Sequence, residues 1–106
     1  MKTLPPLSAL IVTCVTLAAM SNALAVDELH KKYSCTACHQ DGKKLVGPSY
    51  KEVAAKYKTD KDAVKKLSEK VRKGGMGVWG QVPMPPHPAP TDAELKTMIE
   101  SVLKTK

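Results

Sequence analysis

Apolar residues recur at intervals of three and four positions along the second half of the chain, which is the spacing of amphipathic helices. One run at this spacing consists of Val64, Leu67 and Val71. Thr59 or Asp60 is placed to cap the start of that helix, and the glycine pair at 74–75 is a typical C-terminal stop. The pattern therefore predicts a helix that ends just before residue 74.

A capping box opens the last predicted helix. Thr91 and Glu94 stand three positions apart, so each side chain can accept a hydrogen bond from the backbone of the other residue. The apolar positions that follow at helical spacing are Leu95, Met98, Ile99 and Val102. We expect this helix to run to about Lys104 and to bury Met98 in the core.

Two shorter helices are predicted in the first half of the chain. The first runs from Asp27 to Tyr33 with Asp27 as its cap, and the second runs from Ser49 to Tyr57 and buries Val53. No segment shows the sustained polar–apolar alternation of a strand. The chain is therefore predicted to be all-α.

Two loops separate these helices. Turn signals at Asp41-Gly42 and Gly47-Pro48 mark residues 35–48 as a loop. Residues 74–90 hold four of the six glycines and five of the eight prolines. A loop of that length in a small domain is usually functional.

The first 25 residues are typical of a secretory signal peptide. Lys2 precedes an apolar stretch, and Ala23-Leu24-Ala25 is an A-x-A cleavage site. The apolar stretch is too short to span a bilayer, although an uncleaved membrane anchor remains the alternative. We expect residues 1–25, including Cys14, to be removed and residues 26–106 to form one exported domain, in the periplasm and without stable membrane insertion.

Composition adds two constraints on the exported domain. Removing residues 1–25 takes away one of the 17 basic residues and none of the ten acidic ones, which leaves a formal charge of +6. An exported protein rarely meets nucleic acid, so we interpret this charge as a surface for acidic protein partners. The domain has one Trp, three Tyr and no Phe, and so small a core usually needs a staple or a cofactor.

The residues Cys35-Thr36-Ala37-Cys38-His39 form a C-x-x-C-H motif, the attachment signal for c-type haem. Two thiols at this spacing match the two haem vinyl groups, and the histidine that follows can bind the iron. A disulfide or a thioredoxin-like C-x-x-C is the alternative, but no strand precedes the motif. A zinc site would need a second pair of cysteines, which is missing.

A second axial ligand must come from elsewhere in the chain. The candidates are Met76, Met84, Met98, His30 and His87. Met98 fits the apolar face of the last helix, and Met76 stands among glycines that would not hold it still. Pro83, Pro85 and Pro86 flank Met84, and prolines stiffen the backbone. A stiff loop can hold a thioether at the iron in both oxidation states, so Met84 is the predicted ligand.

Three blocks closely resemble the short bacterial class I cytochromes c, the cytochrome c-551/c-552 type. They are residues 33–39, residues 46–56 with Gly47-Pro48, and residues 77–86 with the run Val-Trp-Gly-Gln-Val-Pro-Met-Pro-Pro. The resemblance covers nearly all of residues 26–106. It implies a class I cytochrome c fold of about four short helices wrapped around one covalently bound haem.

The resemblance also implies roles for individual residues. His39 and Met84 would be the axial ligands, and Cys35 and Cys38 the covalent attachment points. The Pro48 carbonyl would accept a hydrogen bond from His39, which fixes the tautomer of a ligating histidine. A further implied contact is a hydrogen bond from the Trp79 N–H to a haem propionate.

Two positions depart from the family pattern. Lys70 stands where some relatives have an Arg that reaches a propionate. His87 stands where relatives often have an Asn that hydrogen-bonds the methionine sulfur, so that contact is lost here or becomes pH dependent.

Iron with two protein ligands has no open position for a substrate, so we expect an electron carrier and not an enzyme. By the same likeness, the predicted role is a monomeric shuttle between a cytochrome bc complex and a terminal reductase or oxidase. The alternatives are a small peroxidase or ligand-binding haem protein, and a structural subunit of a larger complex. The lysine pairs 31–32, 43–44 and 65–66 are either solvated surface or a means of steering toward acidic partners.

Overall fold

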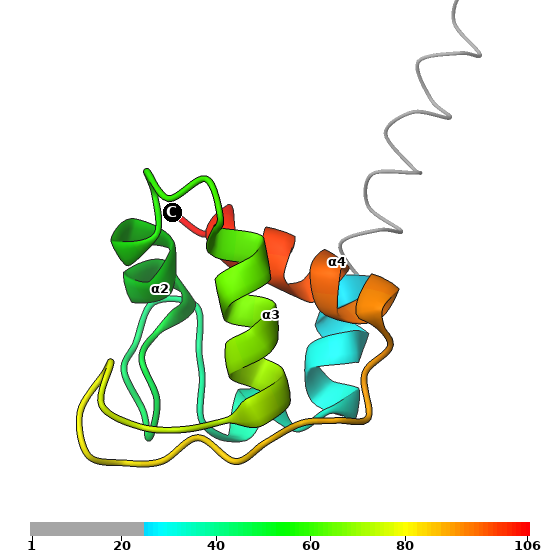
Figure 1. Cartoon of the computed structure of the whole chain (residues 1–106), viewed down its shortest axis with the longest axis horizontal. Coiled ribbons are helices and arrows are strands. Elements are labelled where there is room, and N and C mark those ends of the chain that lie inside the picture. Colours follow the sequence, from blue (N-terminus) through cyan, green and yellow to red (C-terminus); the bar gives the residue numbers. More distant parts are fainter. Residues whose placement is uncertain (1–24) are drawn as a thin grey trace, which may run out of the picture.

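The computed structural model describes residues 25–106. Helical residues 25–32 come first, followed by a short 3-10 helix, η1 (Cys35–Ala37), and three α-helices (Figure 1). These are α2 (Tyr50–Lys56), α3 (Ala63–Lys73) and α4 (Asp92–Leu103). Within residues 25–106 there is no strand, only two isolated bridges, so the predicted all-α fold is confirmed.

The first described helix does not start where the sequence pattern placed it. Residues 25 and 26 are already helical, so Asp27 lies inside the helix and its prediction as the cap is wrong. An acidic residue is favourable anywhere in a first helical turn, and the residue type alone therefore does not locate the cap. The predicted signal peptide and its cleavage site fall almost wholly outside the described residues.

Helix α2 starts with a capping box that the sequence analysis did not identify. Glu52 N donates to Ser49 Oγ at 3.1 Å, and Ser49 N donates to Glu52 Oε2 at 2.8 Å. The helix buries Val53, as predicted, together with Ala54. Tyr50 and Tyr57 at its two ends are half-buried.

Helix α3 starts later than predicted and ends where predicted. Its N-cap is Asp62, without a side-chain cap bond, so the prediction of Thr59 or Asp60 as the cap is wrong. The Asp60 carboxylate accepts instead from Asp62 N at 2.8 Å and from Lys66 Nζ at 2.7 Å. Gly74 ends the helix with φ 67°, a conformation that glycine adopts without steric cost.

Helix α4 carries the core and packs against both α2 and α3. Its predicted capping box is present, and Leu95, Met98 and Ile99 are buried. The partly buried side chains around them are Leu29, Tyr33, Val64, Leu67, Val71 and Leu103. None of the helices in residues 25–106 combines the length and apolar character needed to cross a bilayer.

Candidate cofactor site

A cavity of about 790 Å³ is enclosed by the loop after η1, the faces of α3 and α4, and the loop between these helices. Apolar side chains dominate its lining, among them Val53, Leu67, Val71, Leu95 and Ile99. All seven residues that the sequence analysis assigned to the site line it: Cys35, Cys38, His39, Pro48, Trp79, Met84 and His87. Segments far apart in the chain therefore meet around one apolar space.

The turn of η1 brings both cysteines and the following histidine to the cavity. Cys38 N and His39 N both donate to Cys35 O, at 3.1 Å and 2.9 Å. Both cysteines are half-buried and carry free thiols. Burial raises the pKa of the Cys35 thiol, which is opposite to the lowered pKa of a thioredoxin-like nucleophile. The turn thus presents both cysteine side chains to the cavity.

His39 is held by its Nδ1 atom, which lies 2.7 Å from the Pro48 carbonyl oxygen. A carbonyl can only accept, so Nδ1 carries a proton, and in the neutral ring the lone pair therefore lies on Nε2. The ring also stacks on Tyr50, with centroids 5.6 Å apart and an interplanar angle of 22°. Neutral imidazole held in this way is a good metal ligand.

Gly47 lies directly against the His39 ring. A Cβ atom at this position would stand 2.5 Å from His39 Cε1 and 2.9 Å from Nδ1. The residue before Pro48 must therefore lack a side chain for the ring to keep its place. The Gly47-Pro48 turn signal was visible in the sequence, but this close approach was not.

The loop between α3 and α4 holds Met84 through its backbone. Met84 N donates to Gly75 O at 2.9 Å, and Gly75 N donates to Met84 O at 3.0 Å. Met84 is half-buried, whereas Met76 is 59 % exposed and Met98 lies in the core. All five candidate distal ligands line the cavity. Met84 differs from the others in that its backbone is hydrogen-bonded on both its N–H and its carbonyl group and prolines flank it.

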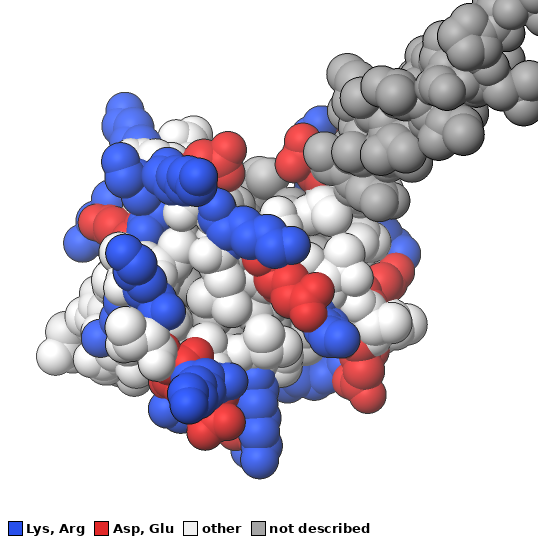
Figure 2. All heavy atoms as spheres, turned by 90° about the horizontal axis from the view of Figure 1, so that it is seen from above, with Lys and Arg blue, Asp and Glu red and all other residues white. Residues whose placement is uncertain are grey.

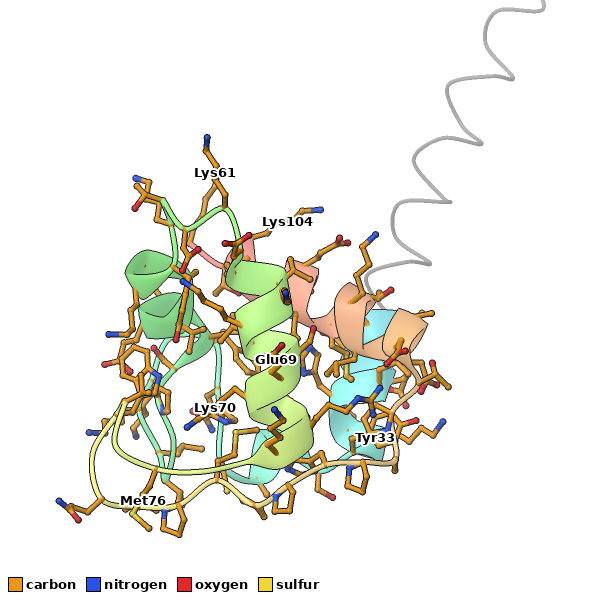
Figure 3. All side chains as sticks on the ribbon, in the orientation of Figure 1. Tyr33, Lys61, Glu69, Lys70, Met76 and Lys104 are labelled. Carbon is orange, nitrogen blue, oxygen red and sulfur yellow. The ribbon has the colours of Figure 1, made fainter. Side chains whose placement is uncertain are left out.

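The exposed side of the cavity is formed by the same loop. Trp79 is 39 % exposed, and Lys56 Nζ stands 5.4 Å from the centroid of its ring. Lys70 lies in the region between α3 and the loops, while Met76 sits on the outer part of the loop (Figure 3). His87 is half-buried, and its backbone N–H donates to Val71 O at 2.9 Å.

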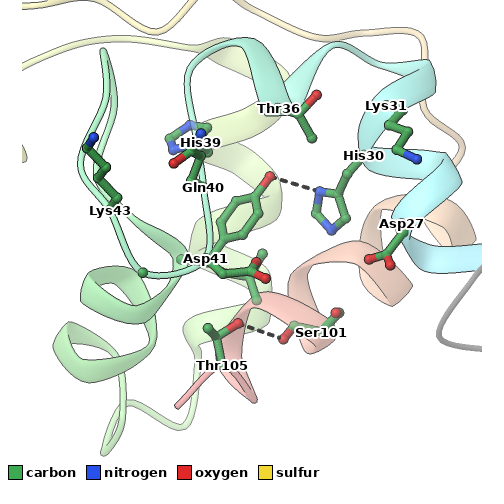
Figure 4. A pocket seen from close by; sticks show the side chains of 13 residues that line it. Asp27, His30, Lys31, Thr36, His39, Gln40, Asp41, Lys43, Ser101 and Thr105 are labelled. Carbon is green, nitrogen blue, oxygen red and sulfur yellow. Dashed lines mark hydrogen bonds between the residues drawn. The ribbon is translucent and has the colours of Figure 1, made fainter.

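A second cavity, of about 590 Å³, shares His30, His39, Tyr50 and Val102 with the first and has a more polar lining (Figure 4). His30 is only 8 % exposed, and the Tyr50 hydroxyl lies 3.1 Å from its Nδ1 atom. Burial lowers the pKa of His30 and raises that of Tyr50. His30, one of the candidate distal ligands in the sequence, is thus a buried residue that bonds to a tyrosine. The hydrogen bond between His30 and Tyr50 joins residues 20 positions apart, and no pattern in the sequence predicts it.

Known proteins of similar sequence and structure identify the family. The sequence model of the family described as Cytochrome c matches residues 23–106. A cytochrome c-551 of Azotobacter vinelandii is 50% identical over 80 residues, which is 76% of this chain and 96% of that protein. A cytochrome c-552 of Hydrogenobacter thermophilus is 47% identical over 97 residues, which is 92% of this chain and 96% of that protein.

A solved structure agrees with these sequences. The crystal structure of wild-type Nitrosomonas europaea cytochrome c552 superposes with a TM-score of 0.71 and 45% identity, covering 76% of this chain and 99% of that chain. The chain therefore belongs to the cytochrome c family, with the class I fold and covalently bound haem c. Membership of this family supports a role as an electron carrier.

The residues around the larger cavity fit this cofactor. The same apolar space is lined by two cysteines at the required spacing and by His39, whose Nε2 makes no bond to Pro48. Met84, whose backbone is hydrogen-bonded to Gly75, also lines it. Gly47 leaves room for the His39 ring where any other residue would intrude. Imidazole and thioether are the donor pair of electron-transfer cytochromes c.

Proposed function

We propose that this protein is a periplasmic electron carrier without catalytic activity of its own. It would accept one electron at a time from a respiratory donor of the cytochrome bc type and pass it to a terminal reductase or oxidase. Support comes from the family, whose similar members are named cytochrome c-551 and c-552, and from the cavity that gathers the expected ligands.

Four residues would hold the cofactor in this proposal. Cys35 and Cys38 would form the covalent attachment, and His39 Nε2 and the Met84 sulfur would be the axial ligands. The observation that carries the proposal is the 2.7 Å hydrogen bond from His39 Nδ1 to Pro48 O, because it leaves Nε2 as the available donor. When bound, haem supplies a one-electron iron couple whose potential is raised by a methionine ligand.

The remaining residues would orient these ligands and limit access of water. Pro48 fixes the tautomer of His39, and ligands fixed in this way move little between oxidation states. Trp79 would donate its N–H to a propionate, and Lys56 would add a cation–π contact to its ring, whose centroid lies 5.4 Å from Nζ. His87, with its backbone tied to Val71, would stand at the Met84 edge of the cavity.

We further propose that residues 1–25 direct export and are cleaved, and that residues 26–106 work as a monomer in the periplasm. Docking would involve acidic surfaces on redox partners. Lysines gather over the side of the molecule that carries α2, whereas acidic side chains are more frequent elsewhere on the same view (Figure 2). The exposed lysines of α2 and the following turn are Lys51, Lys56, Lys58 and Lys61.

Carbon monoxide distinguishes a carrier from a peroxidase or a ligand-binding haem protein. If Met84 stays on the iron, the spectrum of the reduced protein should not change when carbon monoxide is added. A ligand-binding protein has an open or easily opened position, so its spectrum should shift at once. An immediate shift in the native protein would therefore reject the carrier in favour of the alternative.

A further inference from the structure

The segment that follows Met84 has few hydrogen-bond donors of its own. Four of the six residues at 85–90 are prolines, which have no backbone N–H, so only His87 and Ala89 can donate. No helix or strand includes these residues. Bonds from outside the segment must therefore fix its position.

The last turns of α3 supply these bonds. Val71 O accepts from His87 N at 2.9 Å, and the Arg72 guanidinium donates to Pro88 O at 3.1 Å and to Pro90 O at 2.6 Å. The segment runs past the C-terminal end of α3 at the foot of the molecule (Figure 1). Because the backbone of Met84 itself is hydrogen-bonded to Gly75, just after α3, both Met84 and the segment that follows it are tied to the same end of α3.

Arg72 also donates to Asp92 Oδ1 at 2.6 Å, but this contact is the weaker part of the arrangement. The Asp92 side chain is 99% exposed, and exposed ion pairs contribute little. The Arg72 side chain is 29% exposed and Pro90 is buried, so water competes less for the contact with the Pro90 carbonyl than for the contact with Asp92. A planar guanidinium can serve several fixed acceptors at once, which a lysine ammonium cannot do with the same geometry.

We propose that Arg72 is a positioning residue for Met84. By fixing the Pro88 and Pro90 carbonyls, it limits how far residues 84–90 can move, and it therefore keeps the thioether in place. This inference rests on the proposed ligation by Met84. Without Arg72 the segment moves more freely, and a larger fraction of the protein has an iron position open to added ligands.

Cyanide binding to the oxidised, haem-loaded protein measures that open fraction. The apparent affinity of a ligand scales with the population of the competent state, so Arg72→Gln should bind cyanide about tenfold more tightly than the native protein. The far-red methionine band should weaken in parallel. Arg72→Lys should fall between the two, since it restores the positive charge but not the planar guanidinium.

Two control variants separate positioning from general effects. Asp92→Asn removes the charge of the exposed partner, and Lys66→Gln breaks the 2.7 Å ion pair to Asp60 on another part of the surface. Both should bind cyanide like the native protein. Hydrogen exchange at the His87 amide gives a readout independent of the iron, and it should be faster in Arg72→Gln only.

The outcomes distinguish this inference from the function on which it rests. Native cyanide affinity in Arg72→Gln, or an equal gain in Lys66→Gln, would overturn the positioning role. If Met84→Ala binds cyanide no better than the native protein, the ligand assignment fails and the positioning role fails with it. If Met84→Ala opens the iron and Arg72→Gln does not, only the role of Arg72 is rejected.

Discussion

The hydrogen bond from His39 to Pro48 links a local motif to the chemistry of the cavity. It assigns the proton to Nδ1 and the lone pair to Nε2, which is the nitrogen a metal can bind. The contact joins residues nine positions apart across the Gly47-Pro48 turn. A small change at this turn should therefore affect the ligand directly.

Replacing Gly47 with alanine is expected to displace the His39 ring. The added Cβ would stand 2.5 Å from Cε1, so either the ring or the turn must move. Overpacking of this kind costs about 1–3 kcal/mol. The free energy of unfolding of the haem-loaded variant measures the loss.

Gly42→Ala is the matched control, because nothing lies within 4 Å of the place its added Cβ would take and neither glycine has a positive φ. It should remain within about 0.5 kcal/mol of the native protein, as surface substitutions usually do. Equal stability of the two variants would show that the His39 ring has room that the structure does not indicate.

Glu94 makes stability depend on pH. The hydroxyl of Tyr33, the Thr91 backbone and Lys32 all stabilise its charged form, and the pKa of the carboxyl falls from 4.5 to about 2. A carboxylate with a lowered folded-state pKa stabilises the protein above its unfolded pKa and loses that effect as pH falls. Glu94→Gln should therefore unfold more easily than the native protein at neutral pH.

The difference between native protein and Glu94→Gln should shrink between pH 4.5 and about 2. Urea unfolding of both proteins across this range provides the measurement. A difference that stays constant down to pH 2 would mean that the charge of Glu94 contributes nothing and that only the shape of the side chain matters.

Single residues differ in how far the sequence predicts them. Cys35, Cys38 and His39 are neighbours in the chain, so their spacing alone brings them together. Tyr50 was predicted only as part of a helix, yet it lies between His30 and His39. That arrangement depends on the tertiary contact between Tyr50, at the start of α2, and His30 of the first helix, which no local pattern specifies.

At the scale of elements, apolar spacing predicted which segments are helical, and local hydrogen bonds decided where they start. Thr91 and Glu94 form the predicted capping box. Helix α3 starts later than predicted because the Asp60 side chain accepts hydrogen bonds from Asp62 N and Lys66 instead of capping the helix. Both uses of an Asp side chain are favourable, so the sequence could not distinguish them.

Gly74 joins α3 to the loop that carries Met84, and alanine there should disturb both. Its φ is +67°, and a Cβ would clash with the Met84 carbonyl oxygen and crowd Pro85 and Pro86. We expect Gly74→Ala to lose more than the roughly 1–3 kcal/mol that such a sparsely populated positive-φ conformation alone costs, and to weaken the far-red band.

Gly77→Ala provides the control within the same loop. Gly77 also has a positive φ, +104°, but nothing lies within 4 Å of its Cβ position. This variant should show only the conformational cost and keep the far-red band. If both variants keep the band and unfold alike, the contact between Gly74 and the Met84 backbone does not position the ligand.

At the scale of the whole molecule, ion pairs divide the lysines into two groups. Lys31, Lys32, Lys66 and Lys96 pair with acidic residues in the described part of the chain. The three predicted lysine pairs therefore do not behave alike. The lysines of α2 and its following turn make no ion pair within residues 25–106, and Lys61 extends away from the body (Figure 3).

Oxidation by ferricyanide, a small anion, tests whether these lysines attract negative charge. The rate should fall as salt rises, because the Debye length shortens to about 10 Å at 0.1 M. Lys51→Gln with Lys58→Gln should lower the rate at low salt and flatten the salt dependence. Lys31→Gln with Lys96→Gln removes the same number of charges and should have the smaller effect. Equal effects would mean that only net charge matters.

The cavity is a property of the whole fold, and the site residues that line it were predicted on a different basis from the helices. Its walls come from the loop after η1, from α3 and α4, and from the loop that carries Met84. Helical periodicity says nothing about how such distant segments meet. The assignment of Met84, Pro48 and Trp79 came from blocks of sequence shared with a family and from the stiffness of the prolines, and the lining of the cavity is consistent with it.

The absorption spectrum of the oxidised protein tests the proposed ligand pair most directly. The native protein should show the weak far-red band of a methionine–ferric bond, and Met84→Ala should lack it. Met76→Ala should keep the band, because Met76 lies in the same loop but its side chain is largely exposed. Loss of the band in Met76→Ala or Met98→Ala, with Met84→Ala unaffected, would contradict ligation by Met84.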